Sequence, residues 1–380
     1  MTQRNYGIDL LRCVAMFMVL LLHLLLYSGT LVGYPLFSAG YETAWTIELF
    51  AFGAVDIYAL ISGYVGAGRK VRYAGLANLW LTVCFYTVLA TAVFSFLEPA
   101  NYNLTPDSVF HPFVKAFFPV ISNQYWYFCS YFLLFLFLPL LNAGLDALSD
   151  LQLRVTAVTL FLACSVADIF SYIDVLRMAS GYSPMWLVVL YVLGAAIRRN
   201  EPLKKAPKWA LLLGYVVFSA LTALSKYLIG KITLQTRGQI YRDDYLVRYI
   251  SPTVVCAAVC LLLLFSRLNL PGWLQRVTAF LAPSAFCVYL IHENPLVREF
   301  CMKRYFLFLP KCSAPMLALE LVGCAMGLYF ACTAIDLIRR GLFRLLRVKP
   351  RLNRAEEKMG ALLRRRMNKA TPSPSGEADV

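Results

Sequence analysis

Three ionisable residues interrupt a long apolar stretch near the amino terminus: Asp9, Arg12 and His23. In an α-helix, Arg12 and His23 lie on one face, because eleven residues at 100° each complete three turns plus about 20°. They are then separated by roughly 16 Å along the helix axis. Asp9 precedes Arg12 by three residues and can form an ion pair with it. Charged groups cost at least ~2.5–3.5 kcal/mol each at the centre of a bilayer, so these residues are expected to face the protein interior.

Arg12 and His23 suit two different chemical tasks. The planar guanidinium of Arg12 can bind phosphate oxygens in pairs. The imidazole of His23 can act as a general base that takes a proton from a hydroxyl group. Structural roles are the alternatives: Arg12 can be an interfacial anchor paired with Asp9, and His23 can bond a neighbouring helix. The alignment of both residues on one leucine-rich helix favours the functional interpretation.

Further polar residues lie in other apolar stretches. His292 follows Tyr289 by three residues, so both share a helix face and can reach a common cavity. A helix–helix hydrogen bond by His292 is the alternative. Glu293 points about 100° away from His292, which argues against a direct contact between them. Asp56 lies near the middle of its stretch, and we expect it to pair with a histidine or with Arg12.

The composition indicates that membrane helices position these residues. The chain has 380 residues, of which 60% are hydrophobic and 15% charged, and its mean hydropathy is +0.63. Soluble domains average about 25% charged and about 45–50% apolar residues, so the composition excludes a disordered chain and argues against a soluble one. The eleven cysteines lie mostly in apolar runs and form no CxxC. Neither a metal site nor a disulfide framework is predicted.

The sequence predicts an all-α, polytopic membrane protein with about ten transmembrane helices, because each span needs about 20 apolar residues. The first stretch is interpreted as a retained helix rather than a cleaved signal, since charged residues interrupt it. Pro283 interrupts the ninth stretch, which is the least certain to be one continuous helix. The ten stretches are 8–28, 44–66, 76–98, 124–144, 151–171, 183–198, 208–229, 249–267, 275–297 and 316–343.

Lysine and arginine placement predicts that both termini are cytoplasmic. Of the 36 basic residues, 24 fall in segments assigned to the cytoplasm, 11 fall outside and Arg12 lies in the first span. We divide the chain into a transmembrane domain (residues 1–349) and a cytoplasmic tail (residues 350–380). Within the tail, 354–369 is predicted to be a basic amphipathic helix on anionic lipid, and the end is predicted to be disordered. Nucleic-acid binding is not expected.

Two outer segments depart from this charge pattern. Residues 226–248 and 298–311 together carry nine basic residues, among them Arg237 and Arg242. These two are candidates for attracting an anionic acceptor, although a solvated loop would tolerate them equally well. Tyr125, Trp126 and Tyr127 open the fourth stretch and are typical of an interfacial aromatic belt. Trp126 is also a candidate surface for stacking a sugar.

Several motifs resemble the integral-membrane acyltransferase 3 family. The opening NYGIDLLRCVAMFMVLLLH is similar to the first helix of that family, which carries an acidic residue followed by R-x10-H. The segments VDIY and SGY, within residues 55–64, resemble its second-helix element. QYWY (124–127) resembles its aromatic entry motif, and SAFCVYLIH (284–292) resembles its late Y-L-x-H element. These matches occur in the expected order over about residues 5–340.

The resemblance implies transfer of an acyl group, usually acetyl from acetyl-CoA, across the membrane to a sugar or similar hydroxyl. It implies that His23 is the catalytic histidine and that Arg12 contacts coenzyme A or supports the site. Asp9, Asp56, Tyr289 and His292 are then supporting residues. Arg69 and Lys70 belong to a basic stretch that can meet the phosphates of acyl-CoA arriving from the cytosol.

The resulting prediction is a multi-pass plasma-membrane enzyme: an acyl-CoA-dependent O-acyltransferase with no bound cofactor. Its expected partners are acyl-CoA, a glycan or lipid-linked sugar acceptor, and membrane lipid. A proton-coupled carrier that uses buried histidine and aspartate is the alternative. Against a carrier, the sequence shows no repeat symmetry and no pair of Gly- or Pro-broken helices in matching halves.

Overall fold

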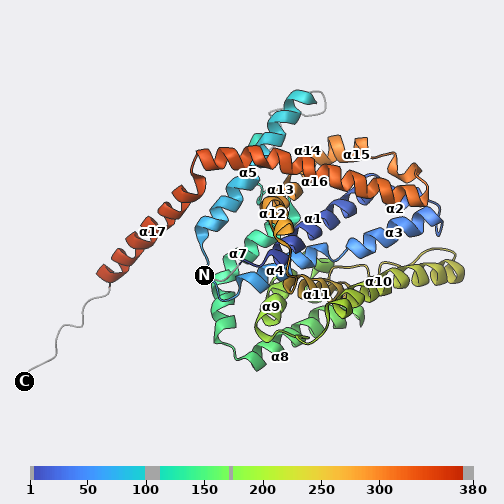
Figure 1. Cartoon of the computed structure of the whole chain (residues 1–380), viewed down its shortest axis with the longest axis horizontal. Helices are drawn as coiled ribbons and strands as arrows, with labels where there is room; N and C mark the ends of the chain where they lie inside the picture. The colour runs from blue at the N-terminus through green and yellow to red at the C-terminus, as the bar shows by residue number, and fades with distance from the viewer. Residues whose placement is uncertain (1–3, 99–111, 171–173, 371–380) are drawn as a thin grey trace, which may run out of the picture.

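Helices and the loops between them make up the whole of the computed structural model, which describes residues 4–98, 112–170 and 174–370 (Figure 1). Short π-helical segments occur at Leu162–Val166 and Arg298–Met302. The α-helices are α1 Tyr6–Tyr27, α2 Thr30–Gly33, α3 Ala39–Ala51, α4 Ala54–Gly66, α5 Tyr73–Leu97, α6 Pro112–Phe117, α7 Trp126–Ala147, α8 Asp150–Phe161, α9 Pro184–Asn200, α10 Lys208–Arg237, α11 Pro252–Ser266, α12 Gly272–Leu281, α13 Ala285–His292, α14 Pro295–Val297, α15 Lys303–Tyr305, α16 Ala314–Leu345 and α17 Val348–Ala370.

The helices confirm an all-α, polytopic membrane protein. Eight helical segments within the described residues are long and apolar enough to span a bilayer, fewer than the predicted ten. The remaining two predicted stretches form α9 (17 residues) and α11 (15 residues), which are shorter than the ~20 residues that a span needs. Both are buried along much of their length, so their apolar character reflects packing against other helices as much as contact with lipid.

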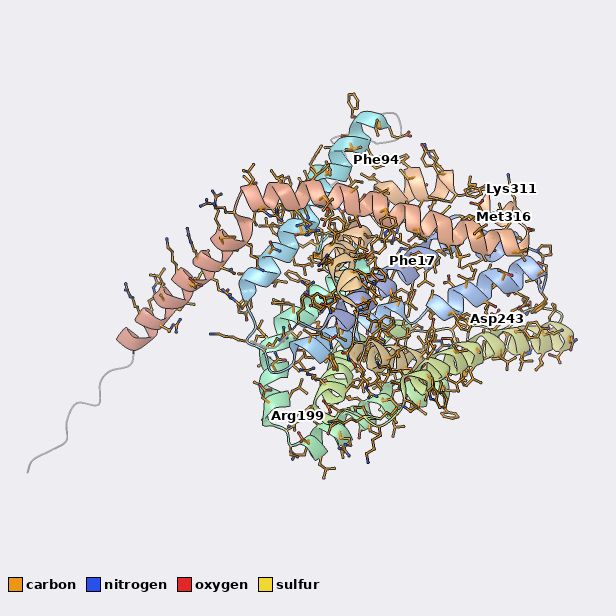
Figure 2. The ribbon with its side chains drawn as sticks, viewed as in Figure 1. Phe17, Phe94, Arg199, Asp243, Lys311 and Met316 are labelled. Carbon is orange, nitrogen blue, oxygen red and sulfur yellow. The ribbon has the colours of Figure 1, made fainter. Side chains whose placement is uncertain are left out.

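Helix α1 lies at the centre of the bundle. It packs against α3, α4, α11, α12, α13 and α16 (Figure 1). Leu11, Leu20, Leu24 and Leu25 are fully buried in this packing. Figure 2 shows Phe17, from the middle of α1, near the middle of the view, and this residue is partly buried against the core, whereas Arg199 lies at the lower edge. The helix that carries Arg12 and His23 is therefore held on several sides.

Three of the eight spans are not continuous α-helices. Span Asp150–Phe170 passes from α8 into a π-helical and then a 3-10 segment. Span Gly272–His292 changes from α12 to a 3-10 turn at Ala282–Ser284 before α13 begins, as expected from Pro283. Span Ala39–Gly66 is interrupted at residues 52–53, between α3 and α4, which the sequence analysis did not predict. Irregular backbone at membrane depth is tolerated where protein or a polar cavity surrounds it.

Helices α4 and α9 approach each other closely through glycine. An added Cβ at Gly63 would lie 1.9 Å from the carbonyl oxygen of Tyr191, and one at Gly194 would lie 2.2 Å from the carbonyl oxygen of Leu60. Both positions therefore require glycine, because each helix meets the other's backbone.

Contacts between loops fall into two groups. At one end, Asn5 donates to the Ser266 carbonyl (2.9 Å) and Arg267 to the Pro202 carbonyl (3.1 Å). At the other end, Tyr34 donates to the Leu309 carbonyl at 3.0 Å. Each pair joins segments that the charge pattern assigns to the same side of the membrane. Which end faces the cytoplasm stays a prediction.

The carboxy-terminal part of the described chain forms helix α17, which extends away from the bundle (Figure 1). Glu356 accepts hydrogen bonds from Arg72 Nε (3.3 Å) and from the backbone N–H of Tyr73 (2.7 Å), so the helix is tied to the start of α5. Its contact with anionic lipid and the division of the chain at residue 349 stay predictions. The end predicted to be disordered lies outside the described residues.

Candidate active site

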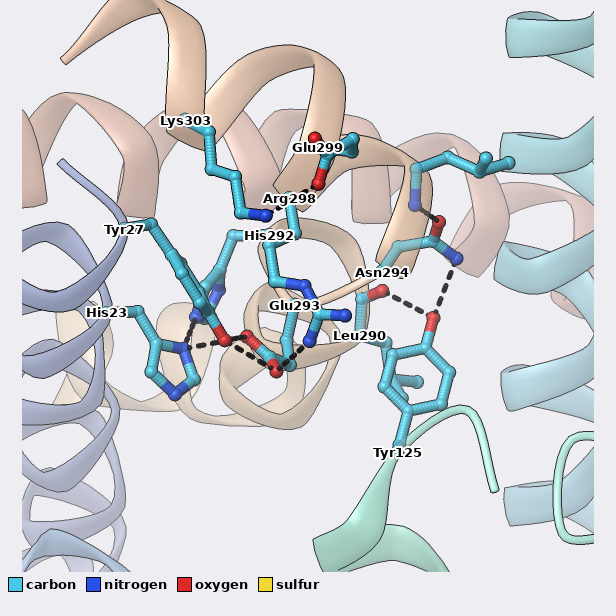
Figure 3. A network of polar contacts seen from close by, with 11 residues as sticks. His23, Tyr27, Tyr125, Leu290, His292, Glu293, Asn294, Arg298, Glu299 and Lys303 are labelled. Atoms are coloured by element: carbon cyan, nitrogen blue, oxygen red, sulfur yellow. Dashed lines mark hydrogen bonds and ion pairs between the residues drawn. The ribbon is translucent and has the colours of Figure 1, made fainter. Parts of the chain in front are cut away.

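His23 lies near the end of α1 in a cluster of aromatic and ionisable residues (Figure 3). Its Nδ1 is 2.8 Å from Nε2 of His292 and 3.2 Å from Oε2 of Glu293. The ring lies between Tyr27 and Tyr289, with centroid distances of 5.4 and 6.4 Å. Its side chain keeps 17% of its surface exposed. His23 is therefore held by several partners and still accessible.

The hydrogen bonds of His292 determine which nitrogens carry protons. Its Nδ1 is 2.6 Å from the Val288 carbonyl oxygen, which can only accept, so Nδ1 carries the proton of the neutral ring. Nε2 of His292 is then an acceptor, and Nδ1 of His23 donates to it. This leaves Nε2 of His23 unprotonated. It points away from these partners (Figure 3) and is placed to accept a proton.

Glu293 is fixed by groups other than its neighbour His292. The Tyr27 hydroxyl donates to both carboxylate oxygens, at 2.9 and 2.8 Å. Arg298 Nη1 lies 3.3 Å from Oε1, and its guanidinium packs over the Tyr27 ring at 5.6 Å. This arrangement holds a carboxylate beside Nδ1 of His23, where it can stabilise the imidazolium that forms when His23 takes a proton.

Tyr125 anchors the backbone on which His292 and Glu293 lie. It is 1% exposed, and its hydroxyl donates to the Leu290 carbonyl at 2.9 Å. The same oxygen accepts from Asn294 Nδ2 at 2.9 Å (Figure 3). The interpretation of Tyr125 as part of an interfacial belt is therefore wrong, because a belt residue would place its hydroxyl at the membrane surface.

Tyr289 joins this cluster, as its spacing from His292 predicts. Its ring lies 6.2 Å from the His292 ring and 6.4 Å from the His23 ring. The Tyr289 hydroxyl is buried, and its proton has no acceptor within hydrogen-bond distance in the described chain. A buried donor without a partner is costly, typically ~1–3 kcal/mol, which suggests that a substrate or water supplies the missing partner.

The opposite end of α1 opens into a basic cavity. Arg12 forms the expected ion pair with Asp9, which also bonds Arg4 at 2.6 Å. Its backbone carbonyl accepts from the Tyr58 hydroxyl at 2.7 Å. The cavity has a volume of about 660 Å³. Four arginines line it, namely Arg4, Arg12, Arg69 and Arg198. Such a concentration of guanidinium groups suits a ligand with several phosphates.

A second basic cavity adjoins the first and shares Arg69 with it. It has a volume of about 280 Å³ and is lined by Lys70, Arg72, Asn142 and Tyr191 among others. The basic stretch 69–72 therefore contributes to both cavities. The structure thus brings Arg12, Asp9, Arg69 and Lys70 to one end of the bundle, and His23, His292 and Tyr289 to another.

Asp56 does not occupy its predicted place. It is fully buried, and its Oδ1 accepts from Trp186 Nε1 at 3.1 Å, rather than from a histidine or Arg12. The prediction failed because it used depth in the membrane alone. Trp186, at the start of α9, supplies the donor because α4 and α9 pack tightly together.

The remaining candidates belong to other side-chain clusters of the described chain. Trp126 stacks in an aromatic cluster with Tyr182 and Tyr249, at 4.7 and 6.2 Å. Arg237 and Arg242 both pack over the ring of Tyr241, at 4.5 and 5.4 Å, at the far end of α10. No contact that the structure records joins either arginine to His23 or its partners, and their role in attracting an acceptor stays a prediction.

Sequence reasoning missed Tyr27, Glu293 and Arg298 as partners of His23. Two signals were available: Tyr27 follows His23 by four residues and so shares its face, and Glu293 is a carboxylate at the end of an apolar stretch. The helical rotation of about 100° between the adjacent side chains of His292 and Glu293 correctly predicted that these two residues would not pair. It could not show that Glu293 faces another helix.

The fold and site define a polytopic helical membrane protein with a buried histidine cluster and a basic cavity at opposite ends of one helix. A family model described as an acyltransferase domain matches residues 5–336, and the chain belongs to this acyltransferase 3 family. It is therefore a membrane acyltransferase, and the alternative of a proton-coupled carrier is set aside. Searches of curated proteins and of solved structures found no match.

Proposed function

We propose that the protein transfers an acyl group, in the first instance acetyl, from cytosolic acyl-CoA to a hydroxyl of an extracytoplasmic or lipid-linked glycan at the plasma membrane. The observation that carries this proposal is the arrangement on α1. One end contributes Arg12 to a four-arginine cavity, and the other presents His23 with an unprotonated Nε2.

The donor binds at the basic end. The phosphates of acyl-CoA contact Arg12 and Arg69, with Lys70 and Arg72 in the adjoining cavity. Arg12 and His23 are separated by roughly 16 Å along a continuous helix. The extended pantetheine arm bridges this separation and brings the thioester to His23.

His23 acts as the general base. Its Nε2 takes the proton of the acceptor hydroxyl, and the hydroxyl oxygen attacks the thioester carbonyl. Glu293 stabilises the imidazolium, and the Tyr289 hydroxyl, whose proton has no acceptor in the described chain, donates to the developing oxyanion. The tetrahedral intermediate collapses, the carbon–sulfur bond breaks, and the imidazolium returns its proton to the leaving thiolate. The products are an ester and free coenzyme A.

We assign direct transfer rather than an acyl-enzyme. The groups that contact the His23 ring within the described chain are Tyr27, Tyr289, His292 and Glu293. None of them is a serine or cysteine that His23 could activate as a nucleophile.

Incubation of the detergent-purified protein with acetyl-radiolabelled acetyl-CoA and a membrane glycan fraction tests the proposal. We expect alkali-labile label on the glycan and one coenzyme A released per ester formed. The His23→Ala protein is the matched control. Equal glycan labelling by both proteins, or no labelling by either, would refute the proposal.

A further inference from the structure

Buried polar atoms without partners gather near the break in the span Ala39–Gly66. Oε2 of Glu48 and Oδ2 of Asp56 lack hydrogen-bond partners in the described structure, and both residues are buried, with 8% and 0% exposure. The hydroxyl of Tyr127 is buried and unpartnered as well. Native proteins leave few buried polar groups unpaired, at a typical cost of ~1–3 kcal/mol each. A group of them indicates a place where a polar ligand completes the hydrogen bonds.

The two carboxylates lie on opposite sides of the helix break. Glu48 is in the last turn of α3 and Asp56 in the first turn of α4, with the break at residues 52–53 between them. Phe52 and Gly53 keep right-handed helical backbone angles (φ/ψ −60°/−32° and −68°/−1°), so α3 and α4 follow one another closely.

Aromatic rings form a wall beside these carboxylates. Tyr249 stacks on Phe52, which lies at the break itself, at 4.7 Å. Trp126 contacts Tyr182 at 4.7 Å, and Tyr182 contacts Tyr249 at 5.0 Å. Phe52 lies four residues after Glu48 and four before Asp56, so Tyr249 packs on the segment that joins them. Tyr182 is 51% exposed, so this aromatic cluster reaches the surface.

The same cluster borders the catalytic histidine. Trp126 follows Tyr125 in the chain, the Tyr125 ring lies 5.8 Å from the Tyr289 ring, and the Tyr289 ring lies 6.4 Å from the His23 ring. Tyr127 extends the cluster from Trp126, with 5.5 Å between ring centroids, toward Tyr58 at 6.4 Å. A ligand held between the carboxylates and the aromatic cluster would therefore lie beside His23.

We infer that Glu48 and Asp56, with Trp126, Tyr182 and Tyr249, bind the uncharged sugar ring of the acceptor next to His23. This inference rests on the proposed transferase function. The carboxylate oxygens accept hydrogen bonds from sugar hydroxyls, and the aromatic faces stack on the apolar face of the ring. The site offers no free cation to a ring that carries an anionic group, because Lys226 is engaged by Asp243, so burial of such a ring is disfavoured.

The nearby cation does not account for the two carboxylates. Lys226 pairs with Asp243 at 2.6 Å and lies over the Trp45 ring at 3.7 Å. Asp56 has a neutral donor, the Trp186 indole, on its other oxygen. The unpartnered oxygens therefore remain available to hydroxyl donors.

Equilibrium dialysis of the full-length, detergent-purified protein without acyl donor tests the inference. The probes are radiolabelled methyl glucoside, methyl galactoside and N-acetylglucosamine, with glucuronate as the anionic counterpart. We expect at least one neutral sugar to bind saturably and at least tenfold more tightly than glucuronate. Glu48→Gln and Asp56→Asn should each weaken that binding about tenfold or more. Both substitutions conserve shape, and asparagine can still accept from Trp186.

Glu42→Gln is the matched control. Glu42 lies on the same helix, α3, but lines an apolar cavity against α10, so its substitution should leave sugar binding within twofold of wild type. Binding by none of the neutral sugars, equal binding of glucuronate, or unchanged binding in both test variants would overturn the inference. Sugar binding without acetyl transfer would instead refute the proposed function and leave this site in place.

Discussion

At the scale of single residues, proton positions in the His23 cluster follow from one backbone carbonyl. The Val288 oxygen fixes the proton on Nδ1 of His292, and His292 in turn fixes the proton on Nδ1 of His23. The reactive Nε2 is thereby kept unprotonated without any charge being required on either ring. The carboxylate of Glu293 then has a separate task, which is to stabilise the charge that appears during the reaction.

We expect His23→Ala to lower kcat by about 10²–10⁴-fold, the usual loss when a general base is removed. Binding of acetyl-CoA should be nearly unchanged, because the phosphates bind at the other end of α1. Isothermal titration of acetyl-CoA beside a turnover assay measures both quantities on the same preparation. Near-normal turnover of His23→Ala would contradict the assignment of His23 as the base.

Arg12→Lys should weaken the binding of the acyl donor rather than slow the chemical step. Lysine keeps the charge but loses the planar, two-pronged geometry, and a hydrogen bond to a charged group is worth ~1.5–3 kcal/mol. We therefore expect the KM for acetyl-CoA to rise about tenfold or more, with a smaller change in kcat.

Arg154→Lys is the matched control for Arg12→Lys. Arg154 belongs to the same predicted cytoplasmic end, where it bonds Asn200 at 3.3 Å, but it does not line the four-arginine cavity. A similar rise in KM for both variants would indicate a general effect of charge geometry rather than a contact made by Arg12.

Much of the chemistry at this scale could be predicted from sequence, but not the contacts between helices. The one-face alignment of Arg12 and His23, and that of Tyr289 and His292, follow from helix periodicity alone. Which residues of another helix face His23 depends on the rotation and packing of α13, and periodicity carries no information on that. Glu293 was missed for this reason, and Asp56 was given the wrong partner.

At the scale of elements, apolar length predicted where helices occur but not where they break without proline. Pro283 marks the break before α13, because proline lacks a backbone donor. The break at residues 52–53 contains phenylalanine and glycine in an otherwise apolar run, and nothing in that pattern distinguishes it from continuous helix. Apolar length also predicted membrane spans at α9 and α11, because it cannot distinguish apolar residues that face other helices from those that face lipid.

The contact between α4 and α9 yields a prediction at this scale. Gly63→Ala should destabilise the protein by ~1–3 kcal/mol, because the added methyl would lie 1.9 Å from a backbone oxygen and the helices must separate. A lower melting temperature of the detergent-purified variant is the measurement. Gly323→Ala in α16 is the control, since an added Cβ there meets nothing within 4 Å. Equal melting temperatures for the two variants would contradict the close approach.

At the scale of the whole molecule, the orientation of the protein in the membrane matters more than any single contact. The proposed reaction needs the four-arginine cavity to open to the cytosol, where acyl-CoA is made available, and His23 to lie toward the outer face. The hydrogen bonds between loops show which loops lie together at each end of the bundle. The charge distribution then assigns the end with the amino terminus to the cytoplasm, because positively charged loops are retained there.

Reporters placed at the two ends of α10 in the otherwise intact chain test this orientation. A fluorescent protein that matures only in the cytoplasm should be bright when inserted after Lys205, between α9 and α10, and dark after Gln235, at the far end of α10. An alkaline phosphatase that is active only outside the cytoplasm should give the reverse pattern. The first site lies just before a helix of 30 residues and the second lies in its last turn, so both results depend on that helix spanning the membrane. Cytoplasmic fluorescence at Gln235 would place His23 toward the cytosolic face, and acyl-CoA could then no longer reach Arg12 from the side on which it is made.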